Sequence, residues 1–317
     1  MQKLKNAQHW RECKELGKTN LPVTLLFGLF KIFPVVCLRA LAFPVSFFYF
    51  VFAKQARHES QRYLKKIFAV TGKRLNPLFH ITAYALTLIE KIEAWAGGKD
   101  LGKRISYNND DVDQLISLIN GGKGTVLVVS HSGNIEFARS LADSGGTKHG
   151  RPIPVNAIVD FSVTPRFNQM LKKLNPQSET NIISANDIGS ETVISLMNKL
   201  EQGEIVSIAG DRTSANTSKC ITIPFLGTDA GFAYGPFLIS ALFNVPTFFV
   251  FALRKKDVSL SCKYEMHVHR SNVTFDCSRA ERENRIKNQA TDYAGYLEKY
   301  CKEHPYQWYN FFNFWAV

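Results

Sequence analysis

One histidine and one glutamate, five positions apart, are the residues in this sequence best suited to acid–base chemistry. His131 follows the apolar run 125–129 after a single serine, and Glu136 stands where a helical pattern begins. A turn between them lets the Glu136 carboxylate accept the Nδ1 proton of His131, which leaves Nε2 to remove a proton from a hydroxyl. The pair therefore predicts a general base with an acid that orients it. A turn histidine that a nearby acid merely satisfies is the alternative.

No protein nucleophile accompanies this pair in the sequence. The G-x-S-x-G pattern is absent, and Ser130 and Ser132 flank His131 too closely to complete a triad with it. The hydroxyl of an acceptor molecule would then be the nucleophile. Backbone amides at the start of the following helix can stabilise the oxyanion that such an attack produces.

Other polar residues near the pair are candidates for binding. Asn134 is a plausible helix N-cap, and Arg139 lies three positions after Glu136, where it can face the same side of the helix. Arg139 would contact a phosphate or a carrier, or remain a solvated surface arginine. His267 and His269 alternate on a predicted strand, but no cysteine or carboxylate stands at a suitable spacing. No metal site is therefore predicted.

Strand and helix patterns alternate from residue 125 onward. The predicted strands cover 125–129, 155–159, 181–183, 205–208, 247–252 and 260–269. The predicted helices cover 57–70, 76–95, 111–120, 134–144, 163–174, 187–202, 235–243 and 278–301. This alternation predicts an α/β fold with a mainly parallel sheet covered by helices. His131 would then lie at the carboxyl end of a strand, where open α/β sheets bind ligands.

Most of the positive charge lies in the first fifth of the chain. Of 317 residues with a formal net charge of +12, the first 66 contain 12 Lys or Arg and only 3 Asp or Glu. The apolar stretch Leu21 to Ala53 lies among them, with basic residues on both sides. Such flanks suit a segment that contacts an anionic membrane surface.

This stretch is long enough to span a bilayer, but Lys31, Arg39 and three prolines interrupt it. We expect one inner-membrane anchor, either a single kinked span or a shallow re-entrant helical pair. A helix buried in a soluble core is the alternative, and the absence of a small-residue cleavage site disfavours a signal peptide. The expected organisation is an anchor with basic flanks over residues 1–56 and an α/β domain over 57–317.

Several segments together resemble the lipid A late acyltransferase branch of the lysophospholipid acyltransferase superfamily, the lauroyl and myristoyl transferases. His131-x-x-x-x-Glu136 resembles the H-x-x-x-x-[DE] motif of the superfamily. The further segments that resemble the branch are Gly203-Glu-Ile-Val-Ser-Ile-Ala-Gly-Asp211-Arg212, Ile223-Pro-Phe-Leu-Gly-Thr-Asp-Ala230, Val245-Pro-Thr-Phe-Phe-Val-Phe251 and His304-Pro-Tyr-Gln-Trp308. They occur in the same order over about residues 20–315. Arg212 replaces the usual Gln, and aromatic residues replace the basic ones that usually follow Trp308.

The resemblance implies a membrane-bound O-acyltransferase at the cytoplasmic face of the inner membrane. It would move a fatty acyl group from acyl carrier protein, or from coenzyme A, to a hydroxyl of a lipid A-like or other glycolipid acceptor. His131 would be the catalytic base and Glu136 its partner, with helix amides or Arg212 at the oxyanion. No cofactor is implied, because the thioester is a co-substrate. The candidate substrate-binding residues are Asn134, Arg139, Asp211 and Arg212.

The basic composition fits the same set of partners. Acyl carrier protein, phosphorylated glycolipids and the anionic cytoplasmic leaflet are all acidic, whereas no nucleic-acid-binding pattern is present. Three alternatives remain at this level. The acceptor could be an aminolipid or an aryl-polyene-type lipid, water could be the acceptor in a thioester hydrolase, or the chain could be a catalytically silent lipid-binding homologue.

Overall fold

The structure, a computed structural model, describes residues 21–96, 101–107, 111–143, 152–160, 182–185, 188–212 and 219–315. Its helices are α1 (Leu21–Ile32), α2 (Val35–Phe52), α3 (Lys54–Thr71), α4 (Pro77–Trp95), the 3₁₀ turn η2 (Leu101–Arg104), α5 (Asp111–Asn120), α6 (Ile135–Asp143), α8 (Ser190–Glu201), α9 (Gly235–Phe243) and α10 (Arg279–Glu303). Its strands are β1 (Ile105–Tyr107), β2 (Thr125–Gly133), β3 (Val155–Val159), β4 (Ile182–Ser184), β5 (Ile205–Ala209), β6 (Cys220–Phe225), β7 (Thr228–Ala233), β8 (Thr247–Arg254) and β9 (Tyr264–Arg270).

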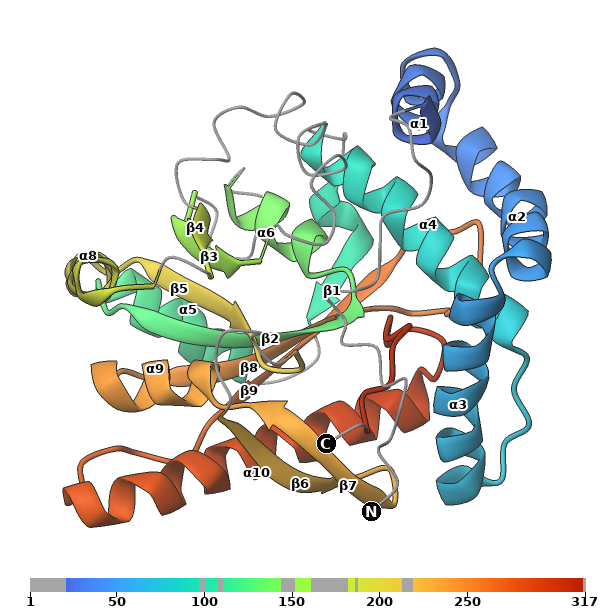
Figure 1. The fold of residues 1–317 in the computed structure, drawn as a ribbon. Helices are drawn as coiled ribbons and strands as arrows, with labels where there is room; N and C mark the ends of the chain where they lie inside the picture. Colours follow the sequence, from blue (N-terminus) through green and yellow to red (C-terminus); the bar gives the residue numbers. More distant parts are fainter. Residues whose placement is uncertain are drawn as a thin grey trace.

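A mixed, mainly parallel sheet forms the centre of the molecule, as the alternating pattern predicts (Figure 1). Within the described residues its strand order is β1-β9-β8-β2-β5-β3-β4. The strands β2, β3, β4, β5 and β8 run parallel, while β9 runs antiparallel to β8. The central position belongs to β2, which pairs with β5 on one side and with β8 on the other.

Both faces of the central strand are buried. Val126 and Val128 face the larger core with the side chains of α8, α9 and α10, whereas Val129 faces a second core with α5 and α6. This division follows from the two-residue repeat of a strand, which sends successive side chains to opposite faces. A strand covered on both faces must be apolar along its whole length, which explains the uninterrupted run Val126 to Val129.

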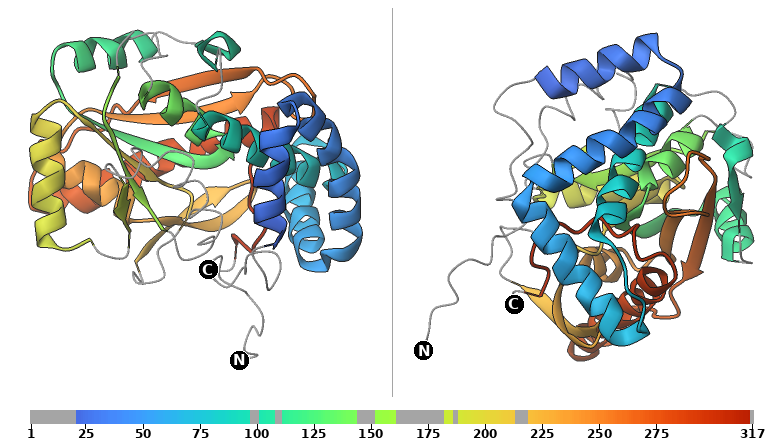
Figure 2. Two further views of the ribbon diagram at one scale, coloured as in Figure 1. Left: turned by 90° about the horizontal axis from the view of Figure 1, so that it is seen from above. Right: turned by 90° about the vertical axis from the view of Figure 1, so that its right-hand side faces the viewer.

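The amino-terminal apolar stretch forms two helices that break at Pro34. Pro34 is the N-cap of α2, where its ring fixes φ and its missing N–H costs no hydrogen bond. By length and composition α2 could cross a bilayer. One face of α2 packs against α4 through Leu38 and Ala42. The right-hand view of Figure 2 displays α1 and α2 on the outside of α4.

The sequence patterns locate most elements within a few residues, although the short strand β1 was not predicted and other elements differ. β2 continues to Gly133 instead of ending at Val129, and β9 begins at Tyr264. The β6–β7 hairpin was not predicted, and its tight turn uses Leu226 and Gly227 with positive φ. The helix predicted over 163–174 lies outside the described residues.

Candidate active site

The chain turns sharply where β2 ends. Gly133 has a φ of +66°, and a Cβ added there would lie 1.9 Å from the carbonyl oxygen of Ala252 on β8. Only glycine fits this close approach in a left-handed conformation. Asn134 follows, and its side-chain oxygen accepts a hydrogen bond from the Phe137 amide at 3.2 Å. As predicted for the N-cap, Asn134 therefore starts α6 and places Glu136 in its first turn.

The imidazole of His131 is held by Asp211. Its Nδ1 lies 2.8 Å from Asp211 Oδ1, and the His131 backbone N–H donates to Asp211 Oδ2 at 2.8 Å. The contact arises because β2 and β5 are parallel neighbours, so the residues that follow them meet at the same edge. The Gly210 amide, just before Asp211, donates to the carbonyl of Val129 at 2.8 Å.

The predicted contact between Glu136 and Nδ1 of His131 is therefore wrong. The Glu136 carboxylate instead lies 3.4 Å from Lys91 Nζ and accepts a 3.3 Å hydrogen bond from Trp95 Nε1, both on α4. A five-residue separation allows Glu136 to turn back toward His131, but the acid on the neighbouring strand reaches Nδ1. Asp211 was among the predicted site residues, but not as the partner of His131. Its place two residues after the buried strand β5 is the sequence signal that could have indicated this role.

The carboxyl-terminal segment closes the site from outside the sheet. Trp308 Nε1 donates to Asp211 Oδ2 at 2.9 Å, and the indole is 1% exposed. Ser132 and Trp308 form an antiparallel bridge, and the Tyr309 amide donates to the His131 carbonyl at 3.1 Å. Sequence reasoning missed this role of Trp308, although the His304 to Trp308 motif had been singled out. Asp211 thus accepts hydrogen bonds from three donors that fix its orientation.

The surroundings of His131, burial first of all, lower its pKa and so favour a neutral imidazole at neutral pH. Burial, and then the neighbouring Arg212 cation, lower the pKa of His131, while Asp211 opposes them. Burial raises the pKa of Asp211, but its contacts with His131 outweigh this effect and the net pKa is lowered. An ionised Asp211 accepts the Nδ1 proton, which leaves a lone pair on Nε2. The His131 side chain keeps 36% of its surface exposed, against 1% for Asp211.

Glu136 is a second ionised carboxylate in the same region. Burial raises its pKa, but Lys91, Arg139 and the Trp95 indole together lower it below the ordinary value. The amino-terminal end of α6 also favours a negative charge at this position. Lys91 and Trp95, four positions apart on α4, were not among the predicted site residues, since nothing in their local sequence sets them apart.

The two predicted arginines supply positive charge near the site, Arg139 from α6 and Arg212 from the position after Asp211. Arg139 is 9% exposed, and its guanidinium lies 5.7 Å from the centre of the Trp95 ring. Arg212 donates to the Tyr309 carbonyl at 3.4 Å and lies 6.0 Å from the Phe312 ring centre. Asn134 caps α6 and Asp211 binds His131, so the structure gives both of these predicted substrate contacts a role within the protein.

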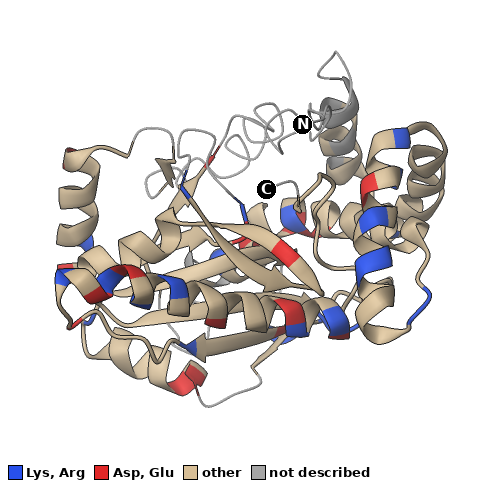
Figure 3. Cartoon of the chain, turned by 60° about the horizontal axis from the view of Figure 1, so that its bottom comes forward, with Lys and Arg blue, Asp and Glu red and all other residues tan. Residues whose placement is uncertain are grey.

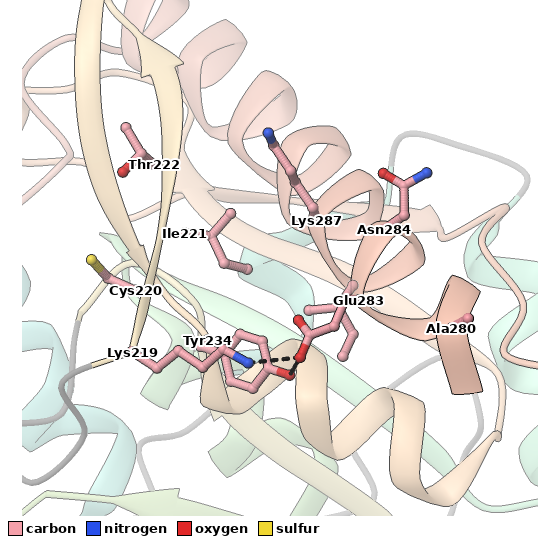
Figure 4. Close-up of a pocket in the computed structure, with 10 residues that line it drawn as sticks. Lys219, Cys220, Ile221, Thr222, Tyr234, Ala280, Glu283, Asn284 and Lys287 are labelled. Atoms are coloured by element: carbon pink, nitrogen blue, oxygen red, sulfur yellow. Dashed lines mark hydrogen bonds and ion pairs between the residues drawn. The ribbon is translucent and has the colours of Figure 1, made fainter. Parts of the chain in front are cut away.

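Two further features lie away from this site. His269 Nε2 is 2.6 Å from the Tyr300 hydroxyl, and the described residues hold no group of three His, Cys, Asp or Glu placed for a metal ion. A hollow of about 500 Å³ lies between the β6–β7 hairpin and α10, where Lys219, Tyr234 and Glu283 contact one another (Figure 4). None of the predicted site residues lines it.

The chain belongs to the bacterial lipid A biosynthesis acyltransferase family, whose sequence profile matches residues 23–316. The protein is therefore an acyltransferase, as the resemblance implied. The match includes His131, Asp211 and Trp308, which the fold brings together from distant parts of the chain. Family membership supports a lipid A-like acceptor and an acyl donor. A comparison with curated proteins finds no significant match.

Proposed function

We propose that the protein transfers a fatty acyl group from the thioester of acyl carrier protein, or of coenzyme A, to a hydroxyl of a lipid A-like glycolipid. The observation that carries this proposal is the partly exposed His131 imidazole, bound at Nδ1 by buried Asp211 at the carboxyl end of the central strand. The serines beside it, Ser130 and Ser132, are buried. A positioned base without an adjacent nucleophile suits direct attack by an acceptor hydroxyl.

In this mechanism Nε2 of His131 takes the proton of the acceptor hydroxyl. At the same time the oxygen of that hydroxyl attacks the carbonyl carbon of the thioester. The tetrahedral intermediate collapses by breaking the carbon–sulfur bond, and the departing thiolate takes the proton from the imidazolium. Asp211 fixes the reactive tautomer and stabilises the imidazolium. Amides in the first turn of α6, or the Arg212 guanidinium, stabilise the oxyanion.

Glu136 keeps a proposed catalytic role different from the one first predicted. Its carboxylate, held by Lys91 and Trp95, places a negative charge at the start of α6 close to the turn that follows His131. This carboxylate orients Lys91 and Arg139 toward an anionic substrate. Asn134 contributes by holding the turn, and Arg139 and Arg212 by contacting phosphate groups.

The basic surface of α3 supports an acidic carrier protein as the donor. Lys and Arg recur along α3 and the segment after it (Figure 3). The exposed ones are Lys54, Lys65, Lys73 and Arg74. Such a surface attracts an acidic protein over several ångströms and raises its association rate. High salt should therefore raise the KM for an acyl carrier protein donor more than the KM for acyl coenzyme A.

The outer face of the α1–α2 pair supports attachment to the cytoplasmic face of the inner membrane. On this face large apolar side chains remain exposed, although burying them would be favourable. They are Leu41, Phe43, Val45, Phe47, Phe48, Val51 and Phe52. The break at Pro34 and the packing of α2 on α4 favour the re-entrant pair over a single span. We propose that residues 1–56 attach the protein and that residues 57–317 carry the reaction.

The purified protein tests the proposal directly. With acyl carrier protein charged with a fatty acid and a lipid A precursor in mixed micelles, mass spectrometry should detect a new acyl ester. Release of free fatty acid alone would identify a thioester hydrolase, and acyl binding without thioester consumption would identify a silent homologue. Intact-mass profiling of lipids from a deletion strain distinguishes a lipid A-like acceptor from an aminolipid or an aryl-polyene-type lipid.

A further inference from the structure

A buried group of charges joins the apolar helix α2 to the interior of the domain. Arg39, on α2, is 7% exposed and forms ion pairs with Glu90 and Glu93 of α4. Arg254, at the end of β8, is fully buried with its guanidinium 3.2 Å from Glu90 Oε1. Arg104 pairs with Glu93 at 2.6 Å. The arginine that interrupts the apolar stretch therefore points into the protein.

The same stretch of α4 also holds the turn that follows His131. Lys91 and Trp95 bind the Glu136 carboxylate, as described above. The Tyr264 hydroxyl donates a short hydrogen bond to Glu90 and lies 3.5 Å from the Asn134 side-chain nitrogen. Side-chain contacts thus lead from Arg39 through Glu90 and Tyr264 to Asn134. The Glu136 end is reached through the α4 backbone, because Lys91 and Trp95 lie on the same helix as Glu90 and Glu93.

Arg39 is not needed to neutralise the buried carboxylates. Without it, Glu90 would still be paired with Arg254, and Glu93 with Arg104. An apolar residue would also suit the surrounding helix, since α2 has no other Asp, Glu, Lys or Arg. Burying a guanidinium in place of a hydrocarbon side chain does not in general add stability. The charge on Arg39 therefore calls for a role other than stabilisation.

We propose that Arg39 is a positioning residue that makes the geometry of the catalytic turn depend on the seating of α2. By binding Glu90 and Glu93 together, it fixes the rotation and height of α4. This helix in turn places Lys91 and Trp95 against Glu136, and its Glu90 holds the Tyr264 hydroxyl beside Asn134. The amino-terminal helical pair is then part of the catalytic unit and not a detachable anchor. This inference rests on the proposed acyl transfer for its kinetic consequence only.

The test compares Arg39→Met with Arg39→Lys and with Leu38→Ala. Methionine keeps the length and apolar stem of Arg39 but removes its charge, whereas lysine restores the charge. Leu38, the neighbouring residue on α2, is 2% exposed and belongs to the apolar cluster with Leu86 and Ile89 of α4. Its truncation controls for simple loosening of the α2–α4 contact, which should appear as a lower Tm.

Two readouts are measured for each variant in the same micelles. For Arg39→Met we expect kcat to fall about tenfold or more with a small change in KM, because a displaced catalytic group slows the reaction step. Hydrogen–deuterium exchange of the peptide covering 131–137 should become faster. Arg39→Lys should recover part of kcat. Leu38→Ala should keep both kcat and the exchange rate of that peptide despite its lower Tm.

Several outcomes would overturn the inference. One is an unchanged kcat and exchange rate in Arg39→Met, and another is a Leu38→Ala variant that reproduces both changes. If Arg39→Met does not fold, a folded Arg39→Lys variant with wild-type kcat and exchange still counts against it, because lysine cannot bridge both carboxylates in the same way. If the wild type makes no ester, the proposed function fails, and the exchange rates alone then decide whether Arg39 positions the turn.

Discussion

Replacing Asp211 by asparagine should slow the reaction without unfolding the protein. Asparagine has nearly the same shape, and its carbonyl oxygen can take the place of Oδ2, which accepts from the His131 amide and from Trp308. Its amide nitrogen then faces Nδ1 of His131 and donates to it. This arrangement puts the imidazole proton on Nε2, the nitrogen that must accept the proton of the acceptor hydroxyl.

The expected size of the effect follows from the contact between His131 and Asp211. The 2.8 Å bond joins Nδ1 to a buried carboxylate, and a hydrogen bond of this charged kind contributes about 1.5 to 3 kcal/mol. At about 1.4 kcal/mol for each factor of ten, its loss lowers kcat by about 10- to 100-fold. The exposed third of the imidazole reduces the electrostatic part, which places the expectation within this range and not above it.

The assay is steady-state acyl transfer with both substrates varied, together with a pH profile of kcat. Asp211 raises the pKa of His131, so its loss should move the acid limb of the profile to lower pH. Asp257→Asn is a matched control, because Asp257 also pairs with a histidine, His304, at 2.9 Å. The reasoning is refuted if Asp211→Asn keeps the wild-type kcat while Glu136→Gln loses it, since Glu136 would then be the partner of His131.

Three other predictions concern the surroundings of the site. Gly133→Ala should lower the free energy of unfolding by about 3 kcal/mol or more, because its Cβ would overlap the Ala252 carbonyl; a urea midpoint like that of the wild type would contradict this. Trp308→Phe loses the bond to Asp211 and leaves a cavity where the indole is buried, so kcat should fall about tenfold and Tm should fall as well; an unchanged kcat in the folded variant would mean that this bond does not orient the carboxylate. Burial lowers the pKa of His80 to about 4, so its contribution to stability is present above pH 6.5 and about 3 kcal/mol is lost as the pH falls to 4. The free energy of unfolding, measured with urea, should therefore decrease less steeply between pH 6.5 and 4 in His80→Gln than in the wild type. An equal decrease in both proteins would argue against the lowered pKa.

The fold and half of the site could be predicted from local patterns. Apolar strands between helical segments define the sheet, and the place of His131 just after the strand 125–129 identifies the base. Local sequence patterns do not predict the order of the strands in the sheet. The pairing of β2 with β5 brings Asp211 beside His131 across 80 positions of sequence.

The environment of a charged residue in an apolar stretch was harder to predict from the sequence. Arg39 is one of the residues that interrupt the apolar stretch, and its partners Glu90 and Glu93 on α4 lie 51 and 54 positions further on. Locally such an arginine has the same appearance whether it reaches toward lipid headgroups or into a protein core. Only the packing of α2 on α4 decides between these two environments.

The most direct test of the account is acyl transfer by His131→Ala, measured as ester product per enzyme beside wild type and His269→Ala. His269 is a partly buried histidine on β9 that contacts Tyr300, away from the reacting groups. If His131 removes the proton of the acceptor, its alanine variant should remain folded and lose at least about 100-fold in kcat, while His269→Ala keeps its turnover. Ester formation at the wild-type rate in a folded His131→Ala protein would contradict the account.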